Sequence, residues 1–118
     1  MPGVYHYKPF DHSIEVVRRG DLRAELCDEA LSQEWIEDAA LSIVIAGVYE
    51  RTMDRYAARG VRYVHMEVGA VAENVYLQAG GVGLGTTLVG AFSDDGVAEL
   101  LRIEEKPLAI MPVGVPVQ

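Results

Sequence analysis

Arg55 and Tyr56 lie in a charged segment that could carry acid–base chemistry. Three further arginines surround the pair: Arg51, Arg59 and Arg62. Lysine can be tuned to act as a general base, whereas arginine stays protonated, so these arginines can supply only positive charge. The same composition is also typical of a solvated helix face with acid–base pairs. The residues alone leave both interpretations open.

The glycine-rich run GGVGLG, residues 80–85, has the composition of a phosphate-binding loop. A phosphate loop follows a strand and opens a helix, and here the order is reversed, so the glycines instead predict the end of a long helix. The histidines His6, His12 and His65 have no metal-ligand spacing, so we expect no metal site. Cys27 is the one cysteine, which excludes an internal disulfide, and we expect it to pack in the core.

One stretch, residues 63–92, is the part of the sequence around which we expect the rest of the chain to be organised. Valine and alanine recur in it at intervals of three and four, which predicts a long helix that is apolar on most sides. Residues 86–89 then predict a buried strand, because they are β-branched and apolar. Gly69, Ala70 and Ala72 are small enough to let a second helix approach closely. Since one small sheet cannot cover so much apolar surface, we expect a homodimer built on this helix.

The rest of the chain alternates between the periods of strands and helices. Asp21 is expected to cap the first helix, and Gly60 to end the third. These patterns predict an α+β domain in which helices pack on one mixed β-sheet around the long central helix. We expect strands at residues 3–7, 14–18, 41–49, 86–89 and 107–113, and helices at residues 22–31, 50–58 and 93–103, with a short helix starting near residue 33.

Length and charge limit the class of protein. The 118 residues predict a single domain, residues 1–118, with one modest core. The formal net charge of -8 argues against a nucleic-acid partner, whose phosphates require a basic patch. We find no signal sequence and no apolar run of membrane-spanning length, so we expect no membrane association and a cytoplasmic location.

Several short motifs carry a resemblance when they are taken together and in order. They are Gly3-Val4-Tyr5-His6-Tyr7, Gly20-Asp21-Leu22-Arg23, Arg51-Thr52, Arg55-Tyr56, Arg59-Gly60-Val61-Arg62-Tyr63 and Pro112-Val113-Gly114, with the central helix and the strand after it. In this order they resemble the nitroreductase family of flavin enzymes, and within it the SagB-type dehydrogenases. The resemblance implies a shortened nitroreductase-like α+β fold.

The resemblance also implies where a flavin mononucleotide (FMN) would lie. In the family, the backbone at the positions of Leu88, Val89, Gly90 and Ala91 lies against the flavin ring and offers an N–H near its reactive nitrogen. Such an N–H stabilises charge on the reduced ring, and a glycine permits close approach. The alternative for these residues is a strand end followed by a turn.

Tyr56 and Arg55 are the catalytic candidates that the resemblance implies. Azoline-oxidising relatives have a lysine-tyrosine pair at a similar position, where Tyr56 matches the tyrosine and Arg55 replaces the lysine. The arginine-rich segment with which the family grips the FMN phosphate is not found in these residues. A phosphate without it would rely on backbone N–H groups, so we expect weak FMN binding or none.

The function that this resemblance implies is an FMN-linked oxidoreductase. It would transfer hydride from a nicotinamide donor, NAD(P)H, to an organic small-molecule acceptor. Nitroreductases are typically homodimers with flavin sites at the subunit boundary. The alternative is a non-catalytic dimeric remnant of the family that acts as a binding or interaction module.

Overall fold

The computed structural model describes residues 1–117, and its core is a three-stranded sheet in the order β3-β5-β4. The strand β5 (Lys106–Gly114) is central, and its run from Pro107 to Val113 is almost wholly buried, as the apolar sequence predicts. It pairs with β3 (Leu41–Gly47) and with β4 (Gly85–Thr86), in both cases antiparallel. The α+β class is therefore confirmed, but the expectation of one mixed sheet is wrong.

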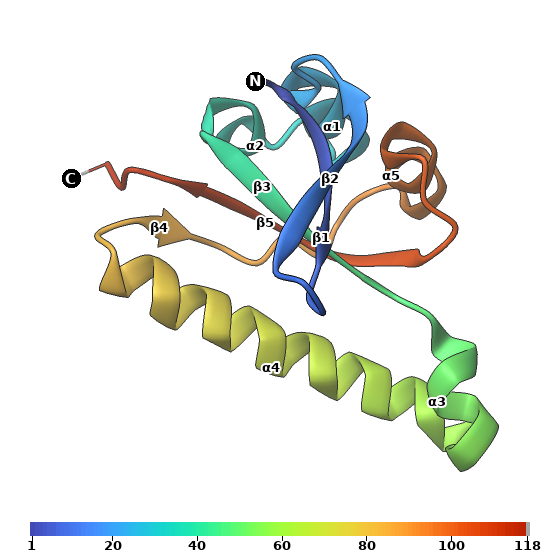
Figure 1. Ribbon diagram of the computed structural model, residues 1–118. Helices are drawn as coiled ribbons and strands as arrows, with labels where there is room; N and C mark the ends of the chain where they lie inside the picture. The colour runs from blue at the N-terminus through green and yellow to red at the C-terminus, as the bar shows by residue number, and fades with distance from the viewer. Residues whose placement is uncertain (118) are drawn as a thin grey trace.

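Short helices cover one face of this sheet, and the long helix lies on the other side (Figure 1). The covering helices are α1 (Arg23–Glu29), α2 (Glu34–Asp38) and α5 (Asp94–Leu101). The core lies between them and the sheet and consists of Leu26, Cys27, Ala30, Ile36, Val89, Val97 and Ile110. Cys27 is thus a packing residue, as expected. No helix among residues 1–117 combines the length and the apolarity that a bilayer crossing requires.

The long helix is α4 (Arg59–Gly81), and it begins earlier than expected. Gly60 does not end the preceding helix α3 (Tyr49–Tyr56), because it already lies inside α4. A Cβ at Gly60 would come within 2.9 Å of the Met53 backbone, so this glycine allows α3 to fold back against α4. The end of α4 is as predicted, with Gly83 at a φ of +79° and the Leu84 N–H donating to the Ala79 carbonyl at 2.8 Å.

The face of α4 that would be free to meet a second helix differs from the one expected. Ala72 is only 2% exposed and packs inside the chain, so its expected place at a helix–helix contact is wrong. Gly69 and Ala70 are exposed, as that contact would require. Large apolar side chains accompany them on the surface, with Met66 61% and Leu77 64% exposed.

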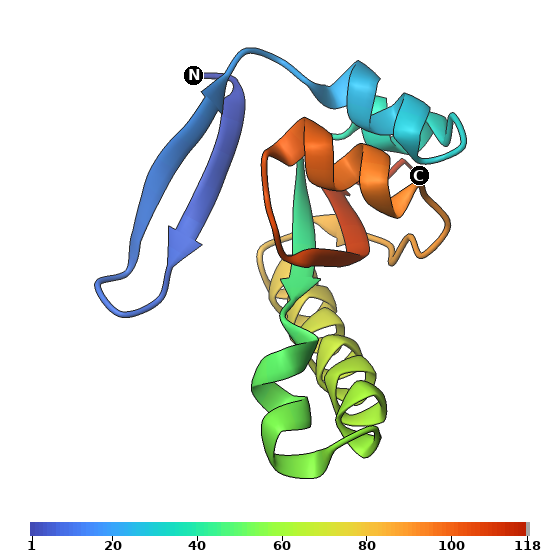
Figure 2. The ribbon, with the colours of Figure 1, turned by 90° about the vertical axis from the view of Figure 1, so that its right-hand side faces the viewer.

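The first two strands form a separate sheet that stands away from the rest of the chain (Figure 2). The antiparallel hairpin of β1 (Gly3–Lys8) and β2 (Ser13–Arg19) pairs Tyr5 with Val16 and Tyr7 with Ile14. All four of these side chains are exposed. One bond to the body comes from the Arg18 guanidinium, which donates to the Leu100 carbonyl at 3.0 Å.

Candidate functional site

The segment from Leu88 to Ala91 is held in place by hydrogen bonds at its start. Val89 pairs with Ile110 through both backbone groups, at 2.8 and 3.0 Å, and its side chain is 4% exposed. The Leu88 N–H donates instead to the Tyr76 hydroxyl, at 2.7 Å. This bond explains why β4 ends at Thr86: the chain leaves the edge of β5 and touches it again only at Val89. Of the strand expected over residues 86–89, only Thr86 lies in β4, so the expectation is wrong for the residues after it.

The backbone beyond Val89 offers hydrogen-bond donors that the chain does not use. Within residues 1–117, no acceptor satisfies the N–H of Gly90 or of Ala91. Apart from Gly90 itself and its two chain neighbours, no atom of residues 1–117 lies within 4 Å of where a Cβ on Gly90 would stand. The Ala91 carbonyl accepts from the Gln33 side chain at 3.0 Å, which fixes the far end. The segment is thus an anchored backbone edge with two free donors, while the N–H of Val89 is committed to the sheet.

Tyr56 and Arg55 occupy the last turn of α3. The ring of Tyr56 packs edge-to-face against Tyr63 with centroids 5.0 Å apart, and the Arg55 guanidinium lies 5.5 Å from the Tyr56 ring centroid. Tyr56 is 45% exposed, and its hydroxyl has no hydrogen-bond partner in the described part of the chain. The ring is therefore positioned by packing, and no hydrogen bond within residues 1–117 fixes the hydroxyl.

A single chain does not bring these two groups together. Tyr56 packs on Tyr63 near the start of α4, whereas Leu88 bonds to Tyr76 near its end. The helical rise of about 1.5 Å per residue separates these two attachment points by roughly 20 Å along the axis. Figure 1 shows the same arrangement, with α3 at one end of α4 and β4 at the other.

Two polar contacts at these positions were not predicted from the sequence. Tyr76 accepts the Leu88 N–H, and Gln33 donates to both the Ala30 and Ala91 carbonyls, at 2.7 and 3.0 Å. The Tyr76–Leu88 and Gln33–Ala91 bonds join residues that are 12 and 58 positions apart, so no local pattern indicates them. A polar-tipped aromatic residue just before a glycine-rich helix end is the one feature that could have drawn attention to Tyr76.

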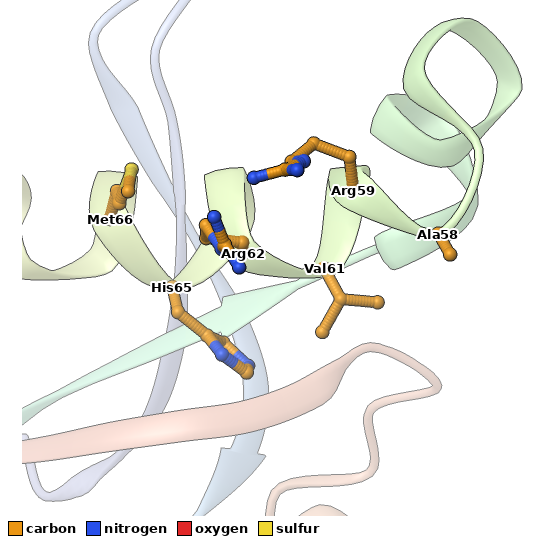
Figure 3. Close-up of a pocket in the computed structure, with 6 residues that line it drawn as sticks. All are labelled: Ala58, Arg59, Val61, Arg62, His65 and Met66. Atoms are coloured by element: carbon orange, nitrogen blue, oxygen red, sulfur yellow. The ribbon is translucent and has the colours of Figure 1, made fainter.

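The arginines around Tyr56 do not form the acid–base pairs that a solvated helix face predicts. Among residues 1–117 the ion pairs within 4.0 Å are Lys8 with Glu15 and Arg23 with Asp21. A shallow depression lies beside Arg59 and Arg62 at the start of α4 (Figure 3). In the same described part of the chain, no three His, Cys, Asp or Glu side chains gather as metal ligands would.

Comparison with known proteins identifies the family to which this fold and backbone edge belong. The family model described as "Nitroreductase family" matches residues 4–115. The chain therefore belongs to the nitroreductase family, as its motifs predict.

Individual relatives agree with this assignment. A protein of Methanocaldococcus jannaschii described as a candidate nitroreductase is 52% identical over 112 residues, which cover 95% of this chain and 57% of that protein. The microcin B17-processing protein McbC of Escherichia coli is 26% identical over 109 residues, or 90% of this chain and 39% of McbC. A crystal structure described as a candidate nitroreductase from Anabaena variabilis superposes with a TM-score of 0.91 at 32% identity, over 98% of this chain and 24% of that one. The chain thus spans about half the length of the first relative, and less of the others.

Proposed function

We propose that this chain is an FMN-linked oxidoreductase that transfers hydride from a nicotinamide donor to a small organic acceptor. The observation that carries the proposal is the anchored backbone edge at Leu88–Ala91, where Gly90 leaves space and two N–H donors are free. Family membership supports an oxidoreductase over the non-catalytic binding module.

The described residues fit the ring of FMN at this edge. The free N–H groups of Gly90 and Ala91 would donate to the ring, and the Leu88 side chain, 41% exposed, offers apolar surface beside them. The chemistry that FMN supplies when bound is two-electron transfer between donor and acceptor. The backbone donors would stabilise negative charge on the reduced ring, which makes accepting a hydride easier. The described residues include no arginine-rich segment like the one with which the family grips the FMN phosphate, so we expect these residues alone to bind FMN weakly.

A second copy of the chain would complete the site. Across a twofold axis, two α4 helices would pack antiparallel through the open face that carries Gly69 and Ala70. The start of one helix would then lie beside the end of the other. This arrangement would place Tyr56 of the partner subunit near Leu88–Ala91, across the separation that one chain cannot close.

In this arrangement Tyr56 would supply its unpaired hydroxyl to the acceptor, and Arg55 would hold positive charge beside it. Arginine remains protonated, so the proton that accompanies the hydride to the acceptor would come from Tyr56 or water rather than from Arg55. The similarity to McbC supports placing the chain in the SagB-type subgroup. We expect the protein to work in the cytoplasm, where nicotinamide donors are available.

Flavin titration of Gly90 variants tests the proposal. FMN fluorescence quenching should show weak, saturable binding to the unaltered chain. Gly90→Val should weaken it by about tenfold, or about 1.4 kcal/mol, because the branched side chain would stand where the ring approaches. The FMN affinity of Gly90→Ala should lie between those of the unaltered chain and Gly90→Val. The melting temperatures of the three chains should agree, because the position of the new Cβ is open. Equal affinity for all three chains would contradict the proposed ring position.

A further inference from the structure

A depression on the first two turns of α4 stands apart from the proposed flavin edge. It is lined by Ala58, Arg59, Val61, Arg62, His65 and Met66. Figure 3 shows Arg62 between Arg59 on one side and His65 on the other. Leu88 is tied to Tyr76 near the other end of the helix, so these side chains do not belong to the backbone edge within one chain.

The charge in this depression is positive, although the molecule as a whole is acidic. The chain carries a formal net charge of -8, yet Arg59 and Arg62 lie one turn apart with no carboxylate within 4.0 Å of either among residues 1–117. The first turn of α4 also contains no acidic residue. Adjacent like charges repel, and a helix start favours negative rather than positive groups. An anion bound between the guanidinium groups would relieve both unfavourable terms.

His65 is fixed in orientation at the edge of the depression. Its Nε2 shares a hydrogen bond of 2.6 Å with the hydroxyl of Tyr49, and the two rings meet edge-to-face at 83°. Burial, with a smaller effect from Asp94, raises the pKa of Tyr49, which keeps this hydroxyl protonated. When the hydroxyl donates to Nε2, the ring hydrogen lies on Nδ1 and becomes a third donor near the two arginines.

We propose that this depression binds a phosphate group. Two guanidinium forks match pairs of oxygens on a tetrahedral anion, and an imidazole N–H can take another oxygen. A carboxylate has fewer oxygens and less charge than a phosphate, so it would satisfy the two forks less completely. Inorganic phosphate, or the phosphate of a nucleotide, presents the same chemistry. The proposal does not depend on the redox function, because its observations concern Arg59, Arg62 and His65 of one chain and not the flavin edge.

The test is a titration of the isotope-labelled full chain with inorganic phosphate, followed by NMR at constant ionic strength. The His65 ring signals and the amides of Arg59 and Arg62 should shift together and saturate. Arg62→Gln should weaken the binding by about tenfold. The control Arg19→Gln removes the same charge from an exposed position on the hairpin. It should change the phosphate affinity by less than about twofold.

Further variants and anions separate the site from general charge attraction. Arg59→Lys keeps the charge but lacks the fork, so its affinity should lie between those of the unaltered chain and Arg62→Gln. Acetate should bind more weakly than phosphate. If AMP binds with the same affinity as phosphate and adenosine does not bind, the result would identify a nucleotide as the source of the phosphate group. Non-saturating shifts, equal effects of the Arg62 and Arg19 variants, or equal affinity for acetate would overturn the proposal.

Discussion

At the scale of single residues, Tyr56 is held by its ring and not by its hydroxyl. The edge-to-face contact with Tyr63 needs no oxygen, and no group in residues 1–117 bonds to the hydroxyl. Tyr56→Phe should therefore leave the melting temperature nearly unchanged. If the hydroxyl acts on the acceptor, steady-state turnover with NAD(P)H and added FMN should fall by about tenfold or more, as for loss of a proton-transfer group. An unchanged rate would remove Tyr56 from the site, and a lowered melting temperature would mark it as structural.

Asp21 gives a second prediction at this scale. Its carboxylate accepts from the Arg23 guanidinium, the closest contact being 2.8 Å, and from the Arg23 backbone N–H at 3.2 Å. The N-cap of α1 is Leu22, so the expectation that Asp21 caps this helix is wrong. The guanidinium bond first, and the backbone bond second, lower the pKa of Asp21 from 3.8 to about 2. The pair thus stabilises the folded chain above pH 3.8, and this stabilisation is lost as the pH falls through about 2.

The effect on stability should be small because both side chains are exposed. NMR titration of the Asp21 carboxyl carbon measures the pKa directly. A midpoint near pH 2 is expected, and Arg23→Gln should raise it toward 3.8. A midpoint near 3.8 in the unaltered chain would show that the pair does not form in solution.

At the scale of elements, α4 presents one buried face and one open face, and two neighbouring alanines distinguish them. Ala70→Glu places a charge on the open face and should convert a dimer to a monomer with little loss of subunit stability. Ala72→Glu buries a charge in a position that is 2% exposed and should lower the free energy of unfolding by more than about 3 kcal/mol. Light scattering coupled to gel filtration gives the mass, and urea denaturation gives the stability. A monomeric unaltered chain at every concentration would refute the dimer.

The elements themselves could largely be predicted from local patterns, and their ends could not. The period of α4 and the apolar run of β5 are properties of the sequence alone, and both elements form where expected. The end of β4 depends on Tyr76, which captures the Leu88 N–H from another element. The sequence predicts that Gly60 ends a helix. In the structure, its lack of a side chain instead allows the close contact with Met53. Such features depend on tertiary contacts that have no local signal.

The candidate site was predictable to a similar degree. The resemblance indicated the region of Val89 to Ala91, but only the hydrogen bonds show that Val89 is committed and that Gly90 and Ala91 hold the free donors. The distance between Tyr56 and this edge is a consequence of the length of α4 and of the turn after α3. The sequence motifs reveal neither the helix length nor the turn. They identify both groups but do not indicate the distance between them.

At the scale of the whole molecule, the two halves of the proposed site lie at opposite ends of α4, and the hairpin of β1 and β2 stands apart from the body. An isolated hairpin is marginally stable, and its exposed Tyr5, Tyr7 and Ile14 provide apolar surface for contact. The open face of α4 provides further apolar surface for contact. These surfaces are consistent with the proposed dimer, in which each flavin site would draw on two chains.

Subunit complementation tests this central claim most directly. Gly90→Val chains should bind FMN more weakly at the proposed edge, and Tyr56→Phe chains should lack the hydroxyl proposed to be catalytic. At sub-saturating FMN, each alone should therefore oxidise NAD(P)H slowly with a nitroaromatic acceptor. Random mixing of equal amounts should make half of the dimers mixed, each with one intact site, and restore about a quarter of the unaltered activity. If Tyr56 and Gly90 instead served the same site from one chain, every site in a mixed dimer would carry one defect. The mixture would then be no more active than the two variants apart, which would contradict a site shared between subunits.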